Sequence, residues 1–190
     1  MALCARPLTY YIESEFGIHR AKAMDNCLFA LRFGPCHQRK LIMINDVYNT
    51  RILEFAGNIQ RLGRLDNPDA TATAHSKLCG STVIVDLKVK DGVVTDFAHD
   101  VKACALGQAS SSIMARHVVG ATSEELHAVR DAMFKMLKEN GAPPQGRFED
   151  LKFLEPVRDY KARHNSTMLT FEAVVDCLDQ IEKKNAEAAA

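Results

Sequence analysis

A β-hairpin near the middle of the chain limits what this sequence can fold into. From Thr82 to Lys90 apolar and polar residues alternate, a pattern typical of a strand with one buried face. The next two residues, Asp91 and Gly92, favour a type I′ turn, because both of its central positions need positive φ. Residues 93–101 are therefore predicted to return antiparallel to the first strand.

Helical patterns flank the hairpin on both sides. Apolar residues at helical spacing predict helices over 45–56, 105–119 and 123–139, one or two turns at 148–154, and a last helix from 166 or 167. The small-residue stretch 70–74 fits either a short edge strand or a mobile segment. The predicted fold class is therefore α+β, a small antiparallel β-sheet packed against several α-helices.

The chain is long enough for one domain with its own core, since 47% of its 190 residues are hydrophobic. We assign this domain to residues 43–190. Residues 1–42 are interpreted as an N-terminal extension of uncertain structure, because glycine and proline interrupt each apolar stretch before a period develops. Met24 and Met43 are candidates for the true translation start, so an artefact of the gene model is the competing interpretation of this extension.

Charge and cysteine content argue against several classes of protein. Lys+Arg and Asp+Glu are equal at 24 each, so nothing indicates the basic stripe with which nucleic-acid-binding proteins contact phosphates. No segment approaches the roughly 20 apolar residues that span a bilayer. The six cysteines are scattered rather than regularly spaced, which favours reduced thiols over a disulfide scaffold. We therefore expect a cytoplasmic protein with no nucleic-acid or membrane partner.

Two of the cysteines stand at the ends of the hairpin. Cys79 comes just before its first strand and Cys104 just after its second, and antiparallel pairing brings these ends together. Paired thiolates suit iron, zinc or copper(I), because soft ligands prefer soft or borderline metals. Cys104 also precedes a predicted helix, whose N-terminus favours the thiolate. The pair is therefore a candidate metal or sulfur site.

Other interpretations of the cysteines stay open. A free cysteine is commonly buried as a small hydrophobic residue, and Cys177, in the apolar stripe of the last predicted helix, fits that description. A disulfide between Cys79 and Cys104 is a further alternative, which a reducing compartment disfavours.

The sequences around the pair resemble the IscU/NifU-type iron–sulfur scaffold family. Leu78-Cys79-Gly80 before a strand and the run ACALGQASSS at 103–112, at a helix start, are similar to its first two cysteine motifs. The Ala-Ser-Ser-Ser run is the most specific part of this likeness. The resemblance extends from about Val47 to Ile181 and implies the IscU/NifU N-terminal-like fold.

The resemblance implies a scaffold or carrier rather than an enzyme. Family members hold a nascent iron–sulfur cluster, or a zinc ion, with three cysteines aided by an aspartate or histidine, and they receive sulfur from a cysteine desulfurase. By this likeness the chain binds iron or a cluster through Cys79 and Cys104 for apo-protein recipients. Residues 154–158, LEPVR, loosely resemble the loop by which some members engage an Hsp70-type chaperone, with a longer spacing to His164 here.

Two departures from the family pattern alter the site. Ser81 stands in place of the aspartate, and either Asn165 or Ser166 stands in place of the third cysteine, depending on how the last helix is aligned. Serine is a poor ligand for soft metals. His164 is the candidate that completes a three-ligand metal set with the cysteine pair, the alternative being a hydrogen-bonded bystander.

These departures leave three functions open. The first is iron–sulfur cluster assembly, by a monomer or by a homodimer in which two chains together supply four thiolates to a labile cluster. The second is sulfur transfer, in which Cys104 accepts a persulfide from the desulfurase. The third is a degenerate paralogue that keeps the fold and has lost metal chemistry.

Overall fold

The computed structural model describes residues 49–188 of the chain. Its strands are β1 (Ala70–His75), β2 (Thr82–Lys90) and β3 (Val93–Lys102), and its helices are α1 (Thr50–Ala56), α2 (Ala105–His117), α3 (Ser123–Lys138), the 3₁₀ segment η2 (Gly146–Asp159) and α4 (Lys161–Ala188). None of these helices is long and apolar enough to cross a bilayer. The predicted α+β class is confirmed, whereas the predicted extension 1–42 lies outside the described residues.

The predicted hairpin is present with its predicted turn. β2 pairs antiparallel with β3, starting from the pair Thr82–Lys102. Asp91 and Gly92 have φ of 52° and 75°, the positive values that a type I′ turn needs at both central positions. β1 pairs antiparallel with the other side of β2, so the small-residue stretch 70–74 belongs to an edge strand.

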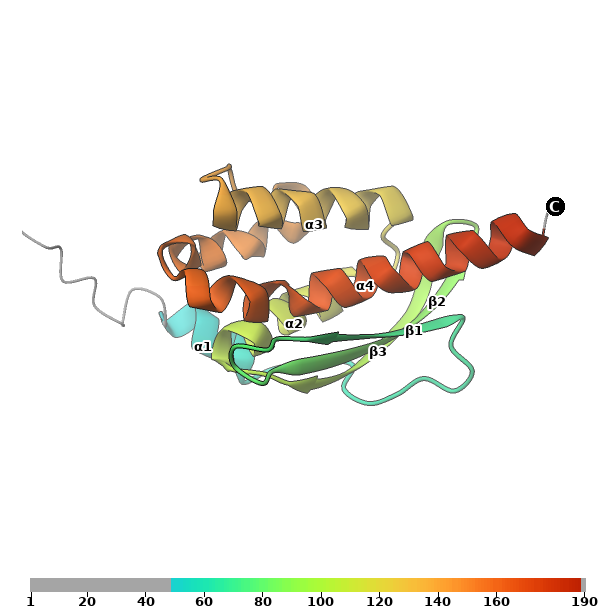
Figure 1. Cartoon of the computed structure of the whole chain (residues 1–190), viewed down its shortest axis with the longest axis horizontal. Helices are drawn as coiled ribbons and strands as arrows, with labels where there is room; N and C mark the ends of the chain where they lie inside the picture. The colour runs from blue at the N-terminus through green and yellow to red at the C-terminus, as the bar shows by residue number, and fades with distance from the viewer. Residues whose placement is uncertain (1–48, 189–190) are drawn as a thin grey trace, which may run out of the picture. The chain divides into compact units, whose positions relative to one another are not determined.

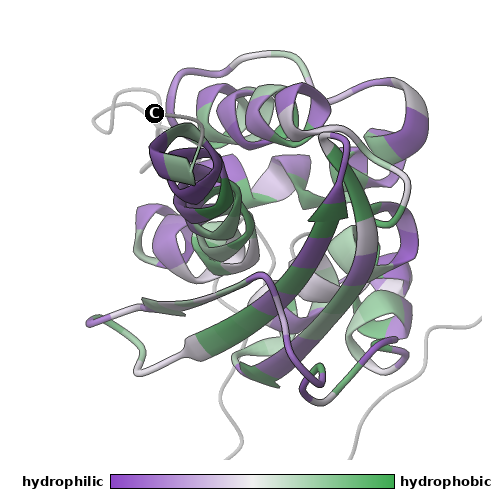
Figure 2. Cartoon of the chain, turned by 90° about the vertical axis from the view of Figure 1, so that its right-hand side faces the viewer, coloured by the Kyte–Doolittle hydropathy of each residue, from purple (hydrophilic) through white to green (hydrophobic). Residues whose placement is uncertain are grey.

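One face of the sheet carries the core. Val83, Val85 and Leu87 of β2 are fully buried, and α4 packs across β1 and β2 on that side. Figure 1 shows the layers, with the sheet at the bottom, α4 across it and α3 above α4. Hydrophobic and hydrophilic residues alternate along the strands, as Figure 2 shows. The helices therefore bury the apolar face that the alternation predicts.

A connection from α1 to β1, the strap (residues 57–69), is fastened to the sheet by a buried carboxylate. Asp86 of β2 accepts hydrogen bonds from the Arg64 guanidinium at 2.6 and 2.9 Å, the Thr71 hydroxyl at 2.6 Å and the Leu65 N–H at 3.0 Å. Burial alone would raise the pKa of Asp86, but these bonds, led by Arg64, outweigh it and lower the pKa. We refer to this group as the Asp86 clasp.

The last two helical segments differ from their predictions. α4 begins at Lys161, before the predicted start at 166 or 167, and η2 extends beyond the predicted turns at 148–154. The first turn of α4 is largely exposed and therefore lacks an apolar repeat, yet Lys161, Ala162 and Arg163 all favour a helix.

The start of α1 is set by its cap. The side-chain oxygen of Asn49 accepts a hydrogen bond from the Ile52 N–H at 2.9 Å, and α1 begins at Thr50. Residues 45–48 of the predicted helix 45–56 lie outside the described residues.

Candidate functional site

Cys79 and Cys104 lie at the edge of the sheet where β2 begins and β3 ends. Cys79 is in the turn that joins β1 to β2, and Cys104 is the N-cap of α2. Sγ of Cys104 lies 3.5 Å from Oγ of Ser166, and the Ser166 hydroxyl also contributes to lowering the pKa of Cys79. The two thiols are therefore neighbours, as the hairpin predicts. We refer to Cys79, Cys104 and Ser166 as the cysteine edge.

Cys79 is exposed, and hydroxyl groups surround its sulfur. Its Sγ lies 3.3 Å from Oγ of Ser76 and 3.0 Å from Oγ of Ser81. Hydrogen bonds from Ser76, then from Ser81, and a smaller one from Ser166 lower the pKa of Cys79 from 9.0 to about 7, although partial burial opposes them. A substantial fraction of Cys79 is therefore thiolate at neutral pH, the form that binds metals and attacks sulfur.

A tight turn holds Cys79 among these serines. The Ser76 N–H donates to the Ser81 carbonyl and the Gly80 N–H donates to the Ser76 carbonyl, both at 2.9 Å. Gly80 has φ of 70°, a left-handed value that glycine adopts without strain. The sequence interpretation missed Ser76. Its position three residues before Cys79 was the available signal, because serine hydroxyls commonly bond to neighbours within a turn.

Small residues after Cys104 bring α2 close to α4. A Cβ added to Gly107 would lie only 2.9 Å from the Ser166 carbonyl oxygen, so glycine is required for this approach. One turn further on, Ser111 of α2 and Thr170 of α4 share a short hydrogen bond between their buried hydroxyls. The Ala-Ser-Ser-Ser run thus positions Cys104 against α4.

Ser166 takes the place that faces the cysteine pair. Its side chain is fully buried beside Cys104, and its hydroxyl donates to the Arg163 carbonyl at 2.9 Å. Asn165 is exposed and lines a separate cavity of about 270 Å³. Of the two alignments of the last helix, the structure therefore favours the one that replaces the third cysteine by Ser166.

The His164 side chain is hydrogen-bonded to backbone carbonyls. It is buried in the first turn of α4, and its Nε2 lies 3.2 Å from the Val157 oxygen and 3.0 Å from the Arg158 oxygen. Within residues 49–188, no group of three or more Cys, His, Asp or Glu side chains is arranged to hold a metal ion. The structure brings the two cysteines together, and it does not bring His164 into a three-ligand set with them.

Two further candidates belong to the core. Cys177 is fully buried, and this burial raises its pKa to about 12, so the thiol is inert. In the LEPVR segment, Leu154 and Val157 are fully buried and Arg158 pairs with Glu155. The apolar side chains of that segment are therefore directed into the fold.

The cysteine edge can bind a soft cation or accept sulfur. Two thiols supply two good ligands for iron or zinc, and the surrounding hydroxyls are weak ligands for such metals. A metal bound here therefore keeps positions for ligands from elsewhere. The exposure of Cys79 gives such ligands access.

Comparison with known proteins identifies the family. Residues 47–167 match the family described as NifU-like N terminal domain. The iron-sulfur cluster assembly scaffold protein IscU of Thermotoga maritima is 26% identical over 137 residues, a match that covers 72% of this chain and 96% of the relative. The protein of the same description from Streptococcus pyogenes is 24% identical over 148 residues, covering 78% of this chain and 90% of the relative.

A solved structure of higher identity shares the fold. The crystal structure of a nitrogen-fixing NifU-like protein (N-terminal) from Brucella abortus is 72% identical, with a TM-score of 0.74, and the match covers 74% of this chain and 98% of that chain. The family match spans more than half of the chain and includes both thiols of the cysteine edge. With its three-stranded sheet, its cysteine-bearing hairpin and these relatives, the chain belongs to the NifU-like N-terminal domain family of IscU/NifU-type scaffolds.

Proposed function

We propose that this protein is an iron–sulfur cluster assembly scaffold or carrier whose Cys79 and Cys104 bind iron or the nascent cluster. Relatives over most of the chain carry the name of cluster assembly scaffold. The observation that supports the residue assignment is that both cysteines lie at the edge of the sheet where β2 begins and β3 ends, with Cys79 exposed. Thiolates are the ligands that hold iron–sulfur clusters in proteins.

The number of thiols favours a cargo that is held loosely. An iron–sulfur cluster commonly takes four thiolate ligands, and the cysteine edge has two. Two copies of the chain, related by a two-fold axis, together supply four. A cluster shared in this way loses two of its four thiolate ligands when one chain dissociates, and a recipient apo-protein can then supply the replacements.

Anaerobic reconstitution with iron and sulfide tests this function. We would use a background in which Cys4, Cys27 and Cys36 are replaced by serine, because these residues lie outside the described structure. The expected result is a visible cluster absorption that Cys79→Ala or Cys104→Ala abolishes and Cys177→Ala leaves intact, since Cys177 is buried in the core.

A reconstitution that yields no cluster contradicts the proposed function. No chromophore at any ratio of iron to sulfide, together with no retained iron or zinc, contradicts the scaffold function. Identical metal content in wild type and Cys79→Ala then supports the degenerate paralogue, which keeps the fold without the metal chemistry.

Sulfur transfer is a second candidate, favoured by the exposure and the lowered pKa of Cys79. In this reaction a thiolate attacks the outer sulfur of a persulfide on a cysteine desulfurase. A new S–S bond forms, the S–S bond of the donor breaks, and the donor leaves as a thiolate, with no net oxidation. Sequence reasoning assigned this role to Cys104, and the surroundings of Cys79 favour it as the first acceptor.

Mass spectrometry separates the two thiols. After incubation with a cysteine desulfurase and free cysteine, we expect one added sulfur atom that survives Cys104→Ala and is lost in Cys79→Ala. The reverse pattern assigns the persulfide to Cys104, and no adduct on either thiol rejects sulfur transfer.

The proposed partners and compartment follow from the same chemistry. A desulfurase supplies sulfur, apo-proteins receive the cluster, and an Hsp70-type chaperone is a further partner. The thiols of Cys79, Cys104 and Cys177 are free, which suits a reducing compartment, and we place the protein in the cytoplasm.

A further inference from the structure

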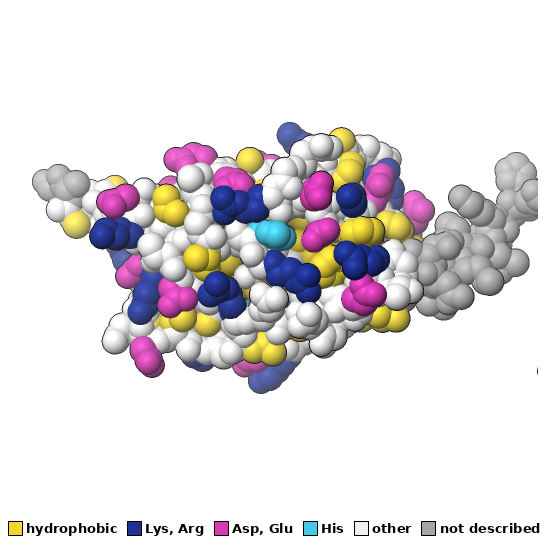
Figure 3. Space-filling model, turned by 180° about the vertical axis from the view of Figure 1, so that it is seen from behind, with side chains coloured by type: hydrophobic (Ala, Val, Ile, Leu, Met, Phe, Trp, Pro, Cys, Tyr) yellow, Lys and Arg dark blue, Asp and Glu magenta, His cyan; other side chains and the backbone are white. Residues whose placement is uncertain are grey.

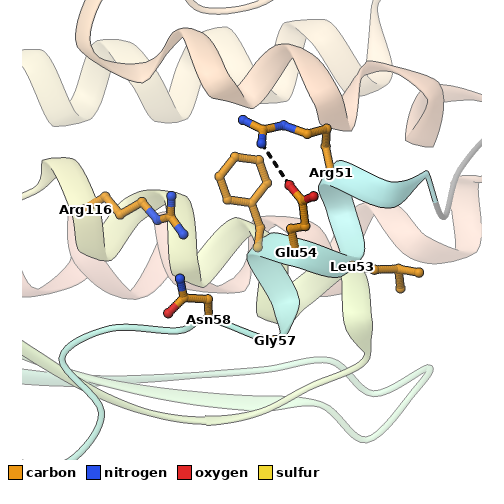
Figure 4. Close-up of a pocket in the computed structure, with 7 residues that line it drawn as sticks. Arg51, Leu53, Glu54, Gly57, Asn58 and Arg116 are labelled. Carbon is orange, nitrogen blue, oxygen red and sulfur yellow. Dashed lines mark hydrogen bonds and ion pairs between the residues drawn. The ribbon is translucent and has the colours of Figure 1, made fainter.

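A cavity of about 490 Å³ lies between α1 and the C-terminal end of α2, and we refer to it as the α1–α2 pocket. It is lined by Arg51, Leu53, Glu54, Phe55, Gly57, Asn58 and Arg116 (Figure 4). Cys104 precedes the first residue of α2, whereas Arg116 is in its last turn, which separates the two along the helix by roughly 18 Å at 1.5 Å per residue. The pocket is therefore distinct from the cysteine edge.

The two arginines of the pocket differ in their ionic partners. Arg51 pairs with Glu54 at 2.8 Å, the interaction drawn in Figure 4. Arg116 stacks on the Phe55 ring, with its guanidinium carbon 4.8 Å from the ring centroid, and among residues 49–188 no carboxylate lies within 4.0 Å of it. Stacking fixes the plane of the guanidinium and leaves its N–H edge available for a carboxylate.

Asn58 adds a second donor on the same side of the pocket as Arg116 (Figure 4). Its backbone carbonyl accepts a hydrogen bond from the Ser112 hydroxyl at 3.0 Å, which anchors the residue to α2. Its side-chain amide makes no hydrogen bond to the part of the chain that the structure describes, so its N–H groups are available. A fixed guanidinium beside a side-chain amide is a donor set for an oxyanion.

The rim of the pocket is apolar on its other side. Leu53, which also lines the pocket, is 53% exposed, one of few large hydrophobic side chains so exposed in the described structure, and Figure 4 shows its side chain directed away from Arg116. The neighbouring Phe153 ring has Arg51 and Lys152 at 5.4 and 5.5 Å from its centroid. Basic side chains bordering hydrophobic ones are also visible on the rear face of the molecule (Figure 3). A ligand that contacts both the donor side and the apolar side of the pocket therefore carries a carboxylate and, next to it, an apolar group.

We propose that the α1–α2 pocket docks a segment of a partner protein in which an Asp or Glu side chain stands beside an apolar side chain. The carboxylate pairs with Arg116 and Asn58, and the apolar side chain covers Leu53. A peptide supplies both groups on adjacent residues, and an open cavity of this size admits two side chains. Glu54 stays neutralised by Arg51, so the net charge that meets the carboxylate is positive.

Titration of the full ¹⁵N-labelled chain with a blocked dipeptide, N-acetyl-Glu-Leu-amide, tests this docking site. We expect saturable shifts of the Asn58 side-chain amide and the Arg116 Nε–H, with a dissociation constant on the order of 1 mM. The matched probe N-acetyl-Gln-Leu-amide should bind about tenfold more weakly, because it lacks the charge-assisted pair. Equal binding of the two probes overturns the proposal.

Substitutions in the pocket should lower the affinity for the Glu-Leu probe in one case and raise it in another. Arg116→Gln should weaken binding of the Glu-Leu probe about tenfold, and Arg61→Gln, which removes an exposed arginine from the strap, should leave it unchanged. Glu54→Gln should tighten binding a few-fold, because it releases Arg51; misfolding cannot produce such a gain. An unchanged affinity in Arg116→Gln contradicts the proposal.

A small dicarboxylate is the other possible source of the carboxylate. Succinate should bind more weakly than the Glu-Leu probe, and Leu53→Ser should weaken only the probe, since only the peptide covers that side chain. If succinate binds as tightly and Leu53→Ser has no effect, the pocket is a small-molecule site and the docking of a partner segment is rejected.

Discussion

The Asp86 clasp lies on the sheet and the cysteine edge lies beside it, and these two polar groups differ in which atoms form hydrogen bonds with them. Asp86 has no exposed side-chain surface, and Arg64, Thr71 and Leu65 of the same chain fill its hydrogen-bonding positions. Cys79 is exposed, and its sulfur lies within hydrogen-bonding distance of the Ser76 and Ser81 hydroxyls. A polar group satisfied by its own chain stabilises the fold, whereas one left accessible is available to cargo. The clasp is therefore structural, and the cysteine edge is the proposed site.

Ser166→Cys should produce the largest effect, because it adds a third thiol to the cysteine edge. We expect the affinity for Zn²⁺ or Co²⁺ to rise on the order of 100-fold, measured by competition with a chromophoric chelator. Asn165→Cys is the matched control, since that neighbouring side chain is exposed and should give little gain. Equal gains in the two variants would place Ser166 outside the metal site.

Asp86→Ala should break the clasp and leave the cysteine edge intact. The free energy of unfolding should fall by about 3 kcal/mol in urea titrations, because the strap loses its buried anchor. Asp96→Ala is the control: Asp96 is half exposed and 3.9 Å from Arg61, so its loss should cost no more than about 0.5 kcal/mol. A loss of metal binding in Asp86→Ala without unfolding would contradict the separation of the two regions.

The clasp also predicts a dependence of stability on pH. The pKa of Asp86 is lower in the folded chain than in the unfolded chain, so its ionised form contributes stability above the unfolded value of about 4. That contribution is lost as the pH falls through the folded pKa. Wild type should therefore lose more stability than Asp86→Ala between neutral and acidic pH, and parallel stability curves for the two proteins would contradict this.

The smallest expected effect is a shift in the pH dependence of thiol alkylation. The rate at which iodoacetamide modifies Cys79, followed by peptide mass mapping, should rise with pH around a midpoint of about 7. The double change Ser76→Ala and Ser81→Ala should move the midpoint upward by about one pH unit. Ser110→Ala, in the interior of α2, is the control that should leave it in place. An unchanged midpoint in the double variant would remove the serines as its cause.

Local signals were sufficient for the elements that carry the cysteines. Alternation and the Asp91-Gly92 pair predicted the hairpin with its turn, and this alone placed Cys79 near Cys104. Both signals act over neighbouring residues, where backbone preference and side-chain direction decide the structure. The start of α4 was predicted too late because its first turn lacks the apolar period on which the prediction depended.

Features that depend on distant residues could not be read from the sequence. The choice between Asn165 and Ser166 depends on the rotation of α4 against α2, and Cys104 and Ser166 are 62 residues apart. The Asp86 clasp joins residues of β2 and the strap through side-chain contacts that no local pattern records. Burial of His164 against the Val157 and Arg158 carbonyls likewise appears only when α4 packs on η2.

Anomalous diffraction at the iron absorption edge, from crystals of the chain reconstituted without oxygen, addresses the role of the cysteine edge most directly. It reports both the position and the element of the cargo. We predict an iron peak within bonding distance of the Sγ atoms of Cys79 and Cys104, next to Ser166. Iron bound elsewhere in the chain, or a cysteine edge without an anomalous peak in protein that contains iron, would contradict the assignment of these two thiols.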